Sequence, residues 1–377
     1  MSHFIYIFVY ILNAINAVKK KHGKLILFIF LCLMMLMFCE VTTPTYQHLG
    51  YFRGDNEIYE AIYEKYPSMS IKGALNGNFA FGSEKGFILY SYLLAKIGVP
   101  FNIYMALTFI WCTALCYVTF RKITSNYSYI LMLYFAYYFL FDIQQIRNFI
   151  GVSIIIFSMG YLFDGKSFKY MVGVLIASLF HVSMLAYLLF LVVNTKSFDK
   201  YSKLIFRTSA FFAIVVSFMN LASLNVIKNF AMSLASVNSS MYIYDKFNAL
   251  RPIIELAMFA YFTFLTHKIH INHLENPIAK KIYHINVVSF LFMPLLLISI
   301  VMDRLMRPAL LLDYAIFANY YSSLGFIKDG HIYVTKDIVW AAGIIICVSV
   351  MYYFFGKTLF TWIFDSNKFI FWLDKIS

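Results

Sequence analysis

The chain has 377 residues, of which 62% are hydrophobic, 20% are aromatic and only 13% are charged, and its mean hydropathy is +0.73. This composition excludes an ordinary soluble domain and indicates an integral membrane protein. The formal net charge is +13, but the basic residues gather in short loops beside apolar runs. That pattern is typical of topology determinants and lipid-headgroup contacts, and it argues against nucleic-acid binding.

Runs without Asp, Glu, Lys or Arg recur from end to end, and many approach the ~20 residues that cross a bilayer as a helix. We predict an all-α integral membrane fold with about eleven transmembrane segments plus re-entrant or short helices. A shorter apolar run precedes the third segment. In chain order, with that run included, the predicted segments are residues 4–18, 25–39, 87–95 (the short run), 102–120, 127–141, 148–163, 170–193, 208–227, 256–266 (extending back through Glu255), 282–302, 308–327 (interrupted by Asp313) and 338–355.

No linker, charge run or internal repeat divides the chain, so residues 1–377 are predicted to form a single polytopic membrane domain. Tryptophan and phenylalanine alternate with polar residues in the C-terminal part, 356–377, which indicates an interfacial amphipathic segment.

Lysine and arginine set the predicted orientation. The lysines between the first two segments have no acid nearby, which places residues 19–24 in the cytoplasm and the N-terminus outside. Alternation then puts on the outer face the loop 41–86, the turn 142–147, the loop 228–251 and the segment 303–307.

One basic loop conflicts with simple alternation. If 170–193 is a single span, the four basic residues of 194–207 lie outside, against the positive-inside rule. If 170–180 and 182–193 instead form a re-entrant pair that turns near His181, this loop returns to the cytoplasm and every later loop agrees. We therefore prefer the re-entrant pair. Such a turn is tolerated only where protein buries it or where it lines a cavity.

Arg147 and His181 are the most informative polar residues. Arg147 opens the uncharged run 148–163, and His181 lies inside the run 170–193. An ionisable group at membrane depth costs a few kcal/mol unless it faces a cavity or a partner, so it indicates a functional site. A headgroup anchor and a simple interhelical hydrogen bond are the competing interpretations. Because Arg147 and His181 occur in consecutive apolar segments, we favour a functional site over these alternatives.

The predicted outer face carries further candidates. Arg53, Asp55 and Tyr59 lie in the loop 41–86, and Glu84 stands where this loop enters an apolar run. Carboxylates accept hydrogen bonds from sugar hydroxyls and aromatic rings stack on sugar faces, so these residues suit a polyhydroxylated ligand. A plain solvated loop is the competing interpretation.

Three arginines, Arg147, Arg304 and Arg307, fall at the outer ends of predicted spans. Arg304 and Arg307 are three residues apart and would share a helical face. Converging guanidinium groups could clamp a pyrophosphate through bidentate hydrogen bonds, and interfacial anchoring is the alternative.

The sequence predicts no cofactor and no metal site. The five cysteines lie inside apolar runs without a CxxC spacing, which indicates small buried side chains. His267, His270 and His273 recur every third residue, but they fit interfacial histidines better than zinc ligands. Neither a dinucleotide fingerprint nor a phosphate-binding loop is present, which argues against a nucleotide-driven machine.

Four short motifs resemble the EpsG-like polysaccharide polymerases, relatives of the O-antigen polymerases. The resemblance extends over about residues 4–355, with Gly151 where the family usually has alanine and with Arg-Gly-Asp where it often has Gly-x-Asp. The matching residues are Arg53-Gly54-Asp55 with Tyr59; Glu84-Lys85-Gly86-Phe87; Ile146-Arg147-Asn148-Phe149-Ile150-Gly151-Val152-Ser153 with Ala177-Ser178-Leu179-Phe180-His181-Val182-Ser183; and Asp303-Arg304.

The resemblance implies a membrane glycosyltransferase that joins repeat units carried on undecaprenyl pyrophosphate. It implies an active site at the outer, periplasmic or extracellular, face of the bacterial cytoplasmic (inner) membrane, and O-antigen, capsule or exopolysaccharide as the product. The lipid pyrophosphate already activates the donor, which agrees with the missing nucleotide motif. The implied partners are the lipid-linked oligosaccharide and membrane lipid, and a chain-length regulator is a further candidate.

The resemblance also implies roles for individual residues. Arg147 and Arg304 would stabilise the pyrophosphate, and His181 would act as a base or an orienting group. The substrate-binding candidates are Arg53, Asp55, Tyr59, Glu84, Asp303 and Arg307.

Three other functions compete with polymerisation. A flippase or other transporter would also keep arginines in a cavity, but transporters often contain two related halves and we find no repeat. A membrane acyltransferase that acts on polysaccharide would need a histidine and an acid in a pocket open to the cytoplasm. A membrane scaffold without activity is the third alternative.

Overall fold

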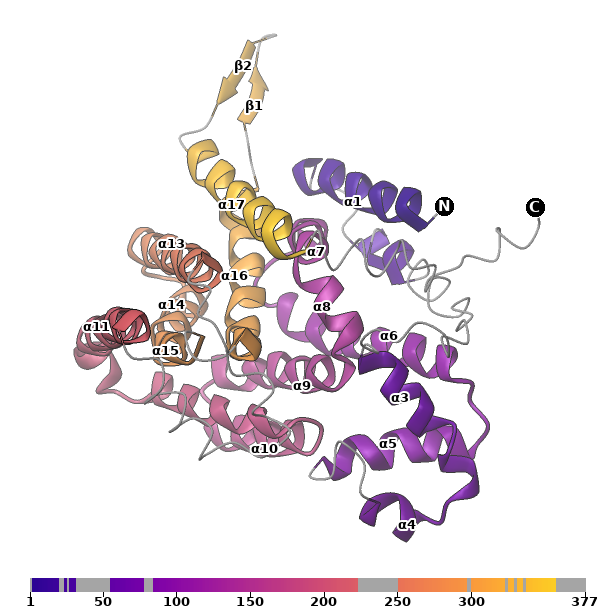
Figure 1. The fold of residues 1–377 in the computed structure, drawn as a ribbon. Helices are drawn as coiled ribbons and strands as arrows, with labels where there is room; N and C mark the ends of the chain where they lie inside the picture. Colours follow the sequence, from indigo (N-terminus) through magenta and orange to yellow (C-terminus); the bar gives the residue numbers. More distant parts are fainter. Residues whose placement is uncertain are drawn as a thin grey trace.

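A computed structural model describes residues 2–19, 24–25, 27–31, 55–77, 84–222, 250–296, 300–322, 325–328, 331–334 and 337–356. This part of the chain is almost entirely helical (Figure 1). Several predictions lie outside the described residues, namely Arg53, the loop 228–249 and the C-terminal residues 357–377. Helix α3 begins at Asp55, of which the backbone alone is described.

The first half of the chain forms short helices followed by longer ones. They are α1 (Ser2–Lys19), α3 (Asp55–Tyr63), η1 (Tyr66–Ser68), α4 (Ile71–Asn76), α5 (Lys85–Lys96), α6 (Phe101–Phe120), α7 (Tyr127–Ala136), α8 (Tyr138–Gln144), α9 (Ile146–Phe163), α10 (Ser167–Ser178) and η2 (Val182–Asn194).

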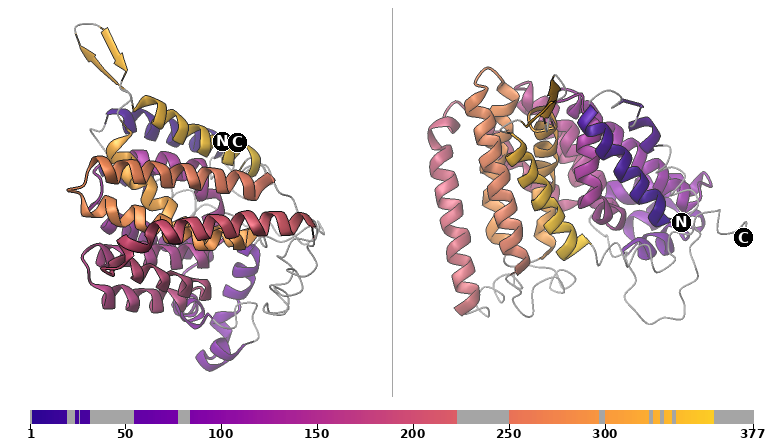
Figure 2. Two further views of the ribbon diagram at one scale, coloured as in Figure 1. Left: turned by 90° about the vertical axis from the view of Figure 1, so that its left-hand side faces the viewer. Right: turned by 90° about the horizontal axis from the view of Figure 1, so that it is seen from above.

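The second half continues the helical bundle and adds one β-hairpin. Its elements are α11 (Phe198–Ala222), α13 (Leu250–Asn272), α14 (Pro277–Ser289), η4 (Phe290–Phe292), α15 (Met293–Leu296), η5 (Ile300–Met306), α16 (Arg307–Tyr320), β1 (Gly325–Lys328), β2 (His331–Val334), α17 (Ile338–Met351) and η6 (Tyr352–Gly356). The two strands pair antiparallel, with Gly325 opposite Val334, and they project from the bundle (Figure 2).

Local sequence signals explain many helix ends. Asn126 and Asn276 cap α7 and α14, because each side chain accepts a hydrogen bond from a backbone N–H of the first turn. Pro277 follows its cap at the first helical position, where its missing N–H costs nothing. Gly98 and Gly165, with φ of 80° and 75°, follow α5 and α9 in the left-handed conformation that glycine adopts most readily.

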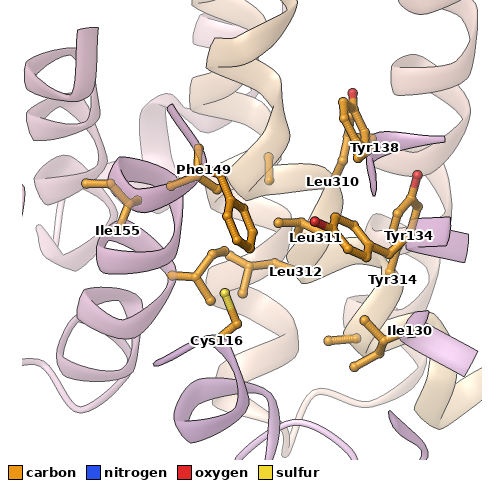
Figure 3. Packing of buried hydrophobic residues seen from close by; sticks show 14 of the residues in the cluster. Cys116, Ile130, Tyr134, Tyr138, Phe149, Ile155, Leu310, Leu311, Leu312 and Tyr314 are labelled. Carbon is orange, nitrogen blue, oxygen red and sulfur yellow. The ribbon is translucent and has the colours of Figure 1, made fainter. Parts of the chain in front are cut away.

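The core is built around α16, which contacts α7, α9, α13 and α14. All residues from Arg307 to Ala318 are buried, including Leu310, Leu312 and Tyr314. Figure 3 shows these side chains among the rings and aliphatic groups that α7, α8 and α9 contribute. A helix buried on all sides packs against several partners at once, so α16 fixes the positions of its neighbours.

Membrane spans are fewer than predicted among the described residues. Two helices, α6 and α9, are long and apolar enough to cross a membrane, and a third candidate arises if η2 and α11 are one span bent by 117°. Shorter apolar helices include α7 and α10. The prediction of about eleven segments is therefore not confirmed. The prediction of apolar helices of a membrane protein is confirmed.

Three predicted segments are interrupted. The run 127–141 breaks into α7 and α8 at Tyr137, whose φ and ψ of −137° and −65° are not helical. The run 282–302 passes through η4 and α15, because Pro294 removes a backbone donor and disfavours a continuous α-helix. The run 308–327 ends as α16 at Tyr320 and continues into the hairpin.

The reversal of the chain near His181 is confirmed. The hydroxyl of Tyr170 in α10 donates to the carbonyl of Tyr187 in η2 at 2.8 Å. The amide of Asn194, at the end of η2, reaches the hydroxyl of Ser167, at the start of α10, at 3.2 Å. The two elements therefore run antiparallel as a hairpin with its turn at His181.

The second arm of this hairpin is a 3₁₀ helix rather than the α-helix that we expected. Its buried residues recur every third position, at Met184, Tyr187, Phe190 and Val193. A 3₁₀ helix has three residues per turn, so these side chains form one straight row against the bundle. His181 precedes this helix as its N-cap residue, with an extended backbone and a side chain that accepts a hydrogen bond from the Ser183 N–H.

Candidate functional site

Four of the predicted site residues meet at the N-terminal end of α9. Tyr59 comes from α3, Glu84 precedes α5, Arg147 lies in the first turn of α9, and His181 lies at the turn between α10 and η2. We call Tyr59, Glu84, Arg147 and His181 the Arg147 cluster. Residues up to 122 positions apart in the sequence are thus brought together, as a binding or catalytic site requires.

Arg147 is held by two side chains. Its Nε donates to the hydroxyl of Tyr59 at 3.0 Å, and its Nη1 forms an ion pair with Oε2 of Glu84. The guanidinium also lies over the Tyr59 ring, 5.4 Å from the ring centre. Glu84 keeps only 5% of its side-chain surface exposed, whereas Arg147 keeps 18%. The arginine is therefore fixed in direction and still accessible.

The position of Arg147 opposes the electrostatics of its own helix. The N-terminus of a helix carries a partial positive charge, and the first turn of α9 contains no acid. A cation there destabilises the helix unless an anion from elsewhere compensates it, and Glu84 is that anion. Because the arginine does not stabilise α9, its presence requires another explanation.

His181 lies against the same carboxylate. Its Nδ1 is 3.7 Å from Oε1 of Glu84, and the hydroxyl of Ser183 is 2.9 Å from the same nitrogen. The imidazole keeps 13% of its surface exposed. The backbone N–H of Val182 also acts electrostatically on the Glu84 carboxylate, so both the backbone and the side chain of the turn face the glutamate.

Two glycines allow this close approach. A Cβ on Gly86 would lie 2.7 Å from Cβ of Leu179, and a Cβ on Gly151 would lie 2.8 Å from Cγ of Met184. The Gly86 N–H donates to the Leu179 carbonyl at 2.9 Å, which binds the start of α5 to the end of α10. These glycines belong to the two motifs that contain Glu84 and Arg147, so their small size serves the geometry of the cluster.

Arg304 extends the positive charge of the cluster. Its charge acts on both Glu84 and His181, and its side chain is partly buried. The Tyr187 hydroxyl donates to the Arg304 carbonyl at 3.0 Å, which anchors η5 on η2. Arg147 and Arg304 therefore bring positive charge toward His181 from two different elements.

Arg307 lies in a second, more deeply buried cluster next to the first. Its Nη1 is 2.7 Å from Oδ1 of Asp142, its Nη2 is 2.8 Å from Oε1 of Gln145, and Asp303 is 3.9 Å away. The Tyr134 hydroxyl donates to Asp142 at 2.9 Å. None of the Arg307 side chain is exposed. The structure thus places Arg307 and Asp303 in a protein-internal network rather than beside Arg147.

Several contributors were missed from the sequence. Asp142 follows the apolar run 127–141. A carboxylate beside an apolar run needs a cationic partner, which could have been sought among the outer arginines. Ser183 follows His181 by two positions, the spacing at which a backbone N–H can reach a side chain. Gln145 and Tyr134 gave no signal, because polar or aromatic residues near a span end are common.

The opposite end of α9 is built differently. Lys281 donates to the carbonyls of Leu162 and Phe163 at 2.9 and 3.0 Å, and Lys122 donates to that of Gly160 at 3.1 Å. Lys122 also forms an ion pair with Asp164 at 3.0 Å, which holds the pKa of that carboxyl below its usual value. We call Lys122, Asp164 and Lys281 the lysine end.

The histidines of α13 lie among aromatic rings. His267 and His270 pack on Tyr283, and His273 packs on Tyr320, with ring centres 4.8, 5.8 and 4.4 Å apart. Within the described ranges, no three His, Cys, Asp or Glu side chains form a group able to hold a metal ion.

Comparison with known proteins decides the family. A model of the EpsG family matches residues 46–367, which is most of the chain. The chain belongs to the EpsG family. This membership associates the protein with membrane polysaccharide biosynthesis and with glycosyl transfer of the polysaccharide-polymerase type. Neither the curated proteins nor the solved structures give a match.

Proposed function

We propose that this EpsG-family protein is a polysaccharide polymerase that joins repeat units carried on undecaprenyl pyrophosphate. The reaction would take place at the outer face of the bacterial cytoplasmic membrane, at the Arg147 cluster. One observation carries the proposal: a partly exposed arginine, placed against its helix dipole at the start of an apolar helix long enough to span a membrane, lies beside a carboxylate and an imidazole.

The chemistry of this transfer matches the groups in the cluster. The acceptor hydroxyl oxygen forms a bond to the anomeric carbon of the growing chain. The bond between that carbon and the diphosphate oxygen breaks, and the diphosphate leaves with the electron pair. Arg147 and Arg304 supply positive charge for the leaving group, and planar guanidinium groups suit phosphate oxygens in particular.

The remaining residues would position these arginines. Tyr59 and Glu84 fix the direction of the Arg147 guanidinium. Arg307 and Asp303 belong to the buried network with Asp142, so in this proposal they hold the segment that carries Arg304. Asp55, the first residue of α3, and Arg53, which lies outside the described residues, remain candidates for the sugar.

Deletion of the gene and gel display of surface polysaccharide test the function. We expect loss of the polymer ladder with retention of single repeat units, and restoration by the wild-type chain. Loss of single repeats together with the ladder would contradict polymerisation and favour a lipid-linked oligosaccharide flippase or an earlier step. An intact ladder that has lost only acyl groups would favour an acyltransferase.

A further inference from the structure

The backbone of the His181 turn determines which ring nitrogen carries the proton. The N–H of Ser183 donates to Nδ1 of His181, with 3.3 Å between the two nitrogens. A backbone N–H is always a donor, so Nδ1 must offer its lone pair and carries no proton itself. A doubly protonated ring is excluded by the same contact, because it would place two donors against each other.

Glu84 does not reverse this assignment. Its Oε1 is 3.7 Å from Nδ1, beyond hydrogen-bonding distance. Its carboxylate is already engaged by the Arg147 guanidinium. The Ser183 hydroxyl, 2.9 Å from Nδ1, is a second group able to donate to it.

The neutral ring therefore carries its proton on Nε2. Among the residues that the structure describes, no group hydrogen-bonds to Nε2, whereas Nδ1 is engaged twice. The side chain keeps 13% of its surface exposed beside Arg147 and within the field of Arg304. The cluster thus presents an N–H donor where two cations already converge.

We propose that His181 donates a hydrogen bond from Nε2–H to a phosphoryl oxygen of the lipid diphosphate, and that Ser183 is the positioning residue that fixes this tautomer. The inference rests on the proposed function and decides between the two roles open to His181. A neutral imidazole in this state stabilises a developing oxyanion as a donor and cannot act as a general base.

The proton of the acceptor hydroxyl must then pass to another group. The carboxylate beside the imidazole is Glu84, which forms an ion pair with Arg147. In the proposed transfer the acceptor oxygen bonds to the anomeric carbon, the diphosphate leaves with the electron pair, and Glu84 receives the proton. His181 keeps its own proton throughout.

Nitrogen-15 NMR tests the tautomer directly. The full-length protein, labelled with [¹⁵N]histidine, is reconstituted in lipid bilayers, and the His181 signals are assigned by their absence in His181→Gln. We expect an unprotonated Nδ1 and a protonated Nε2 in the wild type and in Ser183→Ala, which keeps the backbone N–H. Ser183→Pro removes that N–H in the first helical turn, where proline is tolerated, and should lose the preference. A proton on Nδ1 in the wild type overturns the proposal.

Polymerisation assays of three His181 variants test the donor role. The amide N–H of glutamine reaches approximately the place of Nε2, so His181→Gln should retain activity within about tenfold of wild type. His181→Asn and His181→Ala should lose about a hundredfold or more, as expected for one lost oxyanion donor. Equal loss in all three variants would identify a base and overturn the proposal. A wild type that forms no polymer would refute the proposed function, while the NMR result would still decide the tautomer.

Discussion

The two ends of α9 differ in how the nearby charged side chains relate to the helix dipole. At the C-terminal end, lysines from α14 and from the segment after α6 donate to the last carbonyls, which carry partial negative charge. At the N-terminal end, an arginine stands where the helix is already positive, and a buried glutamate compensates it. The lysine end follows the helix dipole, and the Arg147 cluster opposes it.

This contrast separates structural charge from functional charge. At the lysine end, 32% of the Lys122 side-chain surface and 37% of that of Asp164 are exposed, so water screens their ion pair. The Arg147 cluster is far more buried, and all four of its side chains are charged or polar. Such an arrangement costs stability unless a ligand uses it, so the functional site should lie at the N-terminal end of α9.

The largest expected effect is on activity. Arg147→Lys keeps the charge but loses the planar fork that binds Tyr59 and Glu84 through separate nitrogens. We expect about a hundredfold or greater loss of polymer with normal membrane insertion. Arg304→Lys should behave similarly, and the matched control Arg121→Lys, at the exposed C-terminal end of α6, should not. Polymer yield measures activity, and protein level in membranes measures insertion. Wild-type yield in both Arg147→Lys and Arg304→Lys would refute the binding of the pyrophosphate by these arginines.

The second largest effect is on stability. Arg307→Leu leaves Asp142 buried without its guanidinium partner, which should lower the free energy of unfolding by about 3–5 kcal/mol. The double variant with Asp142→Leu removes both charges and should recover most of that loss. Thermal unfolding of detergent-solubilised protein provides the comparison. If the double variant is no more stable than the single one, the ion pair is not what the network depends on.

A third prediction concerns the close approach at Gly86. Gly86→Ala places a methyl group 2.7 Å from Cβ of Leu179, so the His181 turn must move away from Glu84. Overpacking of this kind costs about 1–3 kcal/mol, and the displaced imidazole should reduce polymerisation by roughly tenfold. The control is Gly73→Ala, where the added methyl meets only the Ser70 hydroxyl, at 3.2 Å. Equal activity of the two variants would show that the distance between α5 and α10 is not critical.

The smallest effect is expected at the lysine end. Asp164→Asn should cost less than about 1 kcal/mol, because the pair with Lys122 is exposed. The hydrogen bond from Lys122 lowers the pKa of Asp164 below 3.8, so its contribution is complete above that pH and is lost only as the pH falls through the lowered value. The stability difference should therefore be the same at pH 5 and pH 8. A difference that grows between these values would point to another titrating group.

Part of this contrast could be predicted from the sequence. Arg147 and His181 were recognisable because ionisable residues are rare in apolar runs, and the turn at His181 followed from the basic loop 194–207. The sequence did not reveal that Glu84 pairs with Arg147 or that Asp142 pairs with Arg307, 165 residues away. Such contacts depend on how helices pack, and a single sequence contains no record of that packing.

The predicted span count is not confirmed, for a related reason. One apolar run breaks into two helices at Tyr137, although residues 127–144 contain no glycine or proline that would signal a break. Hydropathy measures the length of an apolar run but not its continuity as a helix. The three-residue period of η2 was equally hidden, because nearly every residue from Val182 to Val193 is apolar and the run shows no polar face.

Photo-crosslinking tests most directly which end of α9 receives the lipid-linked sugar. A photoreactive phenylalanine analogue is placed at one of two positions. The first is Phe180, next to His181 in the sequence. The second is Tyr201 on α11, which follows the Asn194 end of η2, where Asn194 contacts the Leu162 carbonyl near the lysine end. Each protein is reconstituted with an undecaprenyl-pyrophosphate-linked oligosaccharide and irradiated. We predict that position 180 labels the oligosaccharide and that position 201 does not. Labelling at 201 without labelling at 180 would contradict the assignment of the site to the Arg147 cluster.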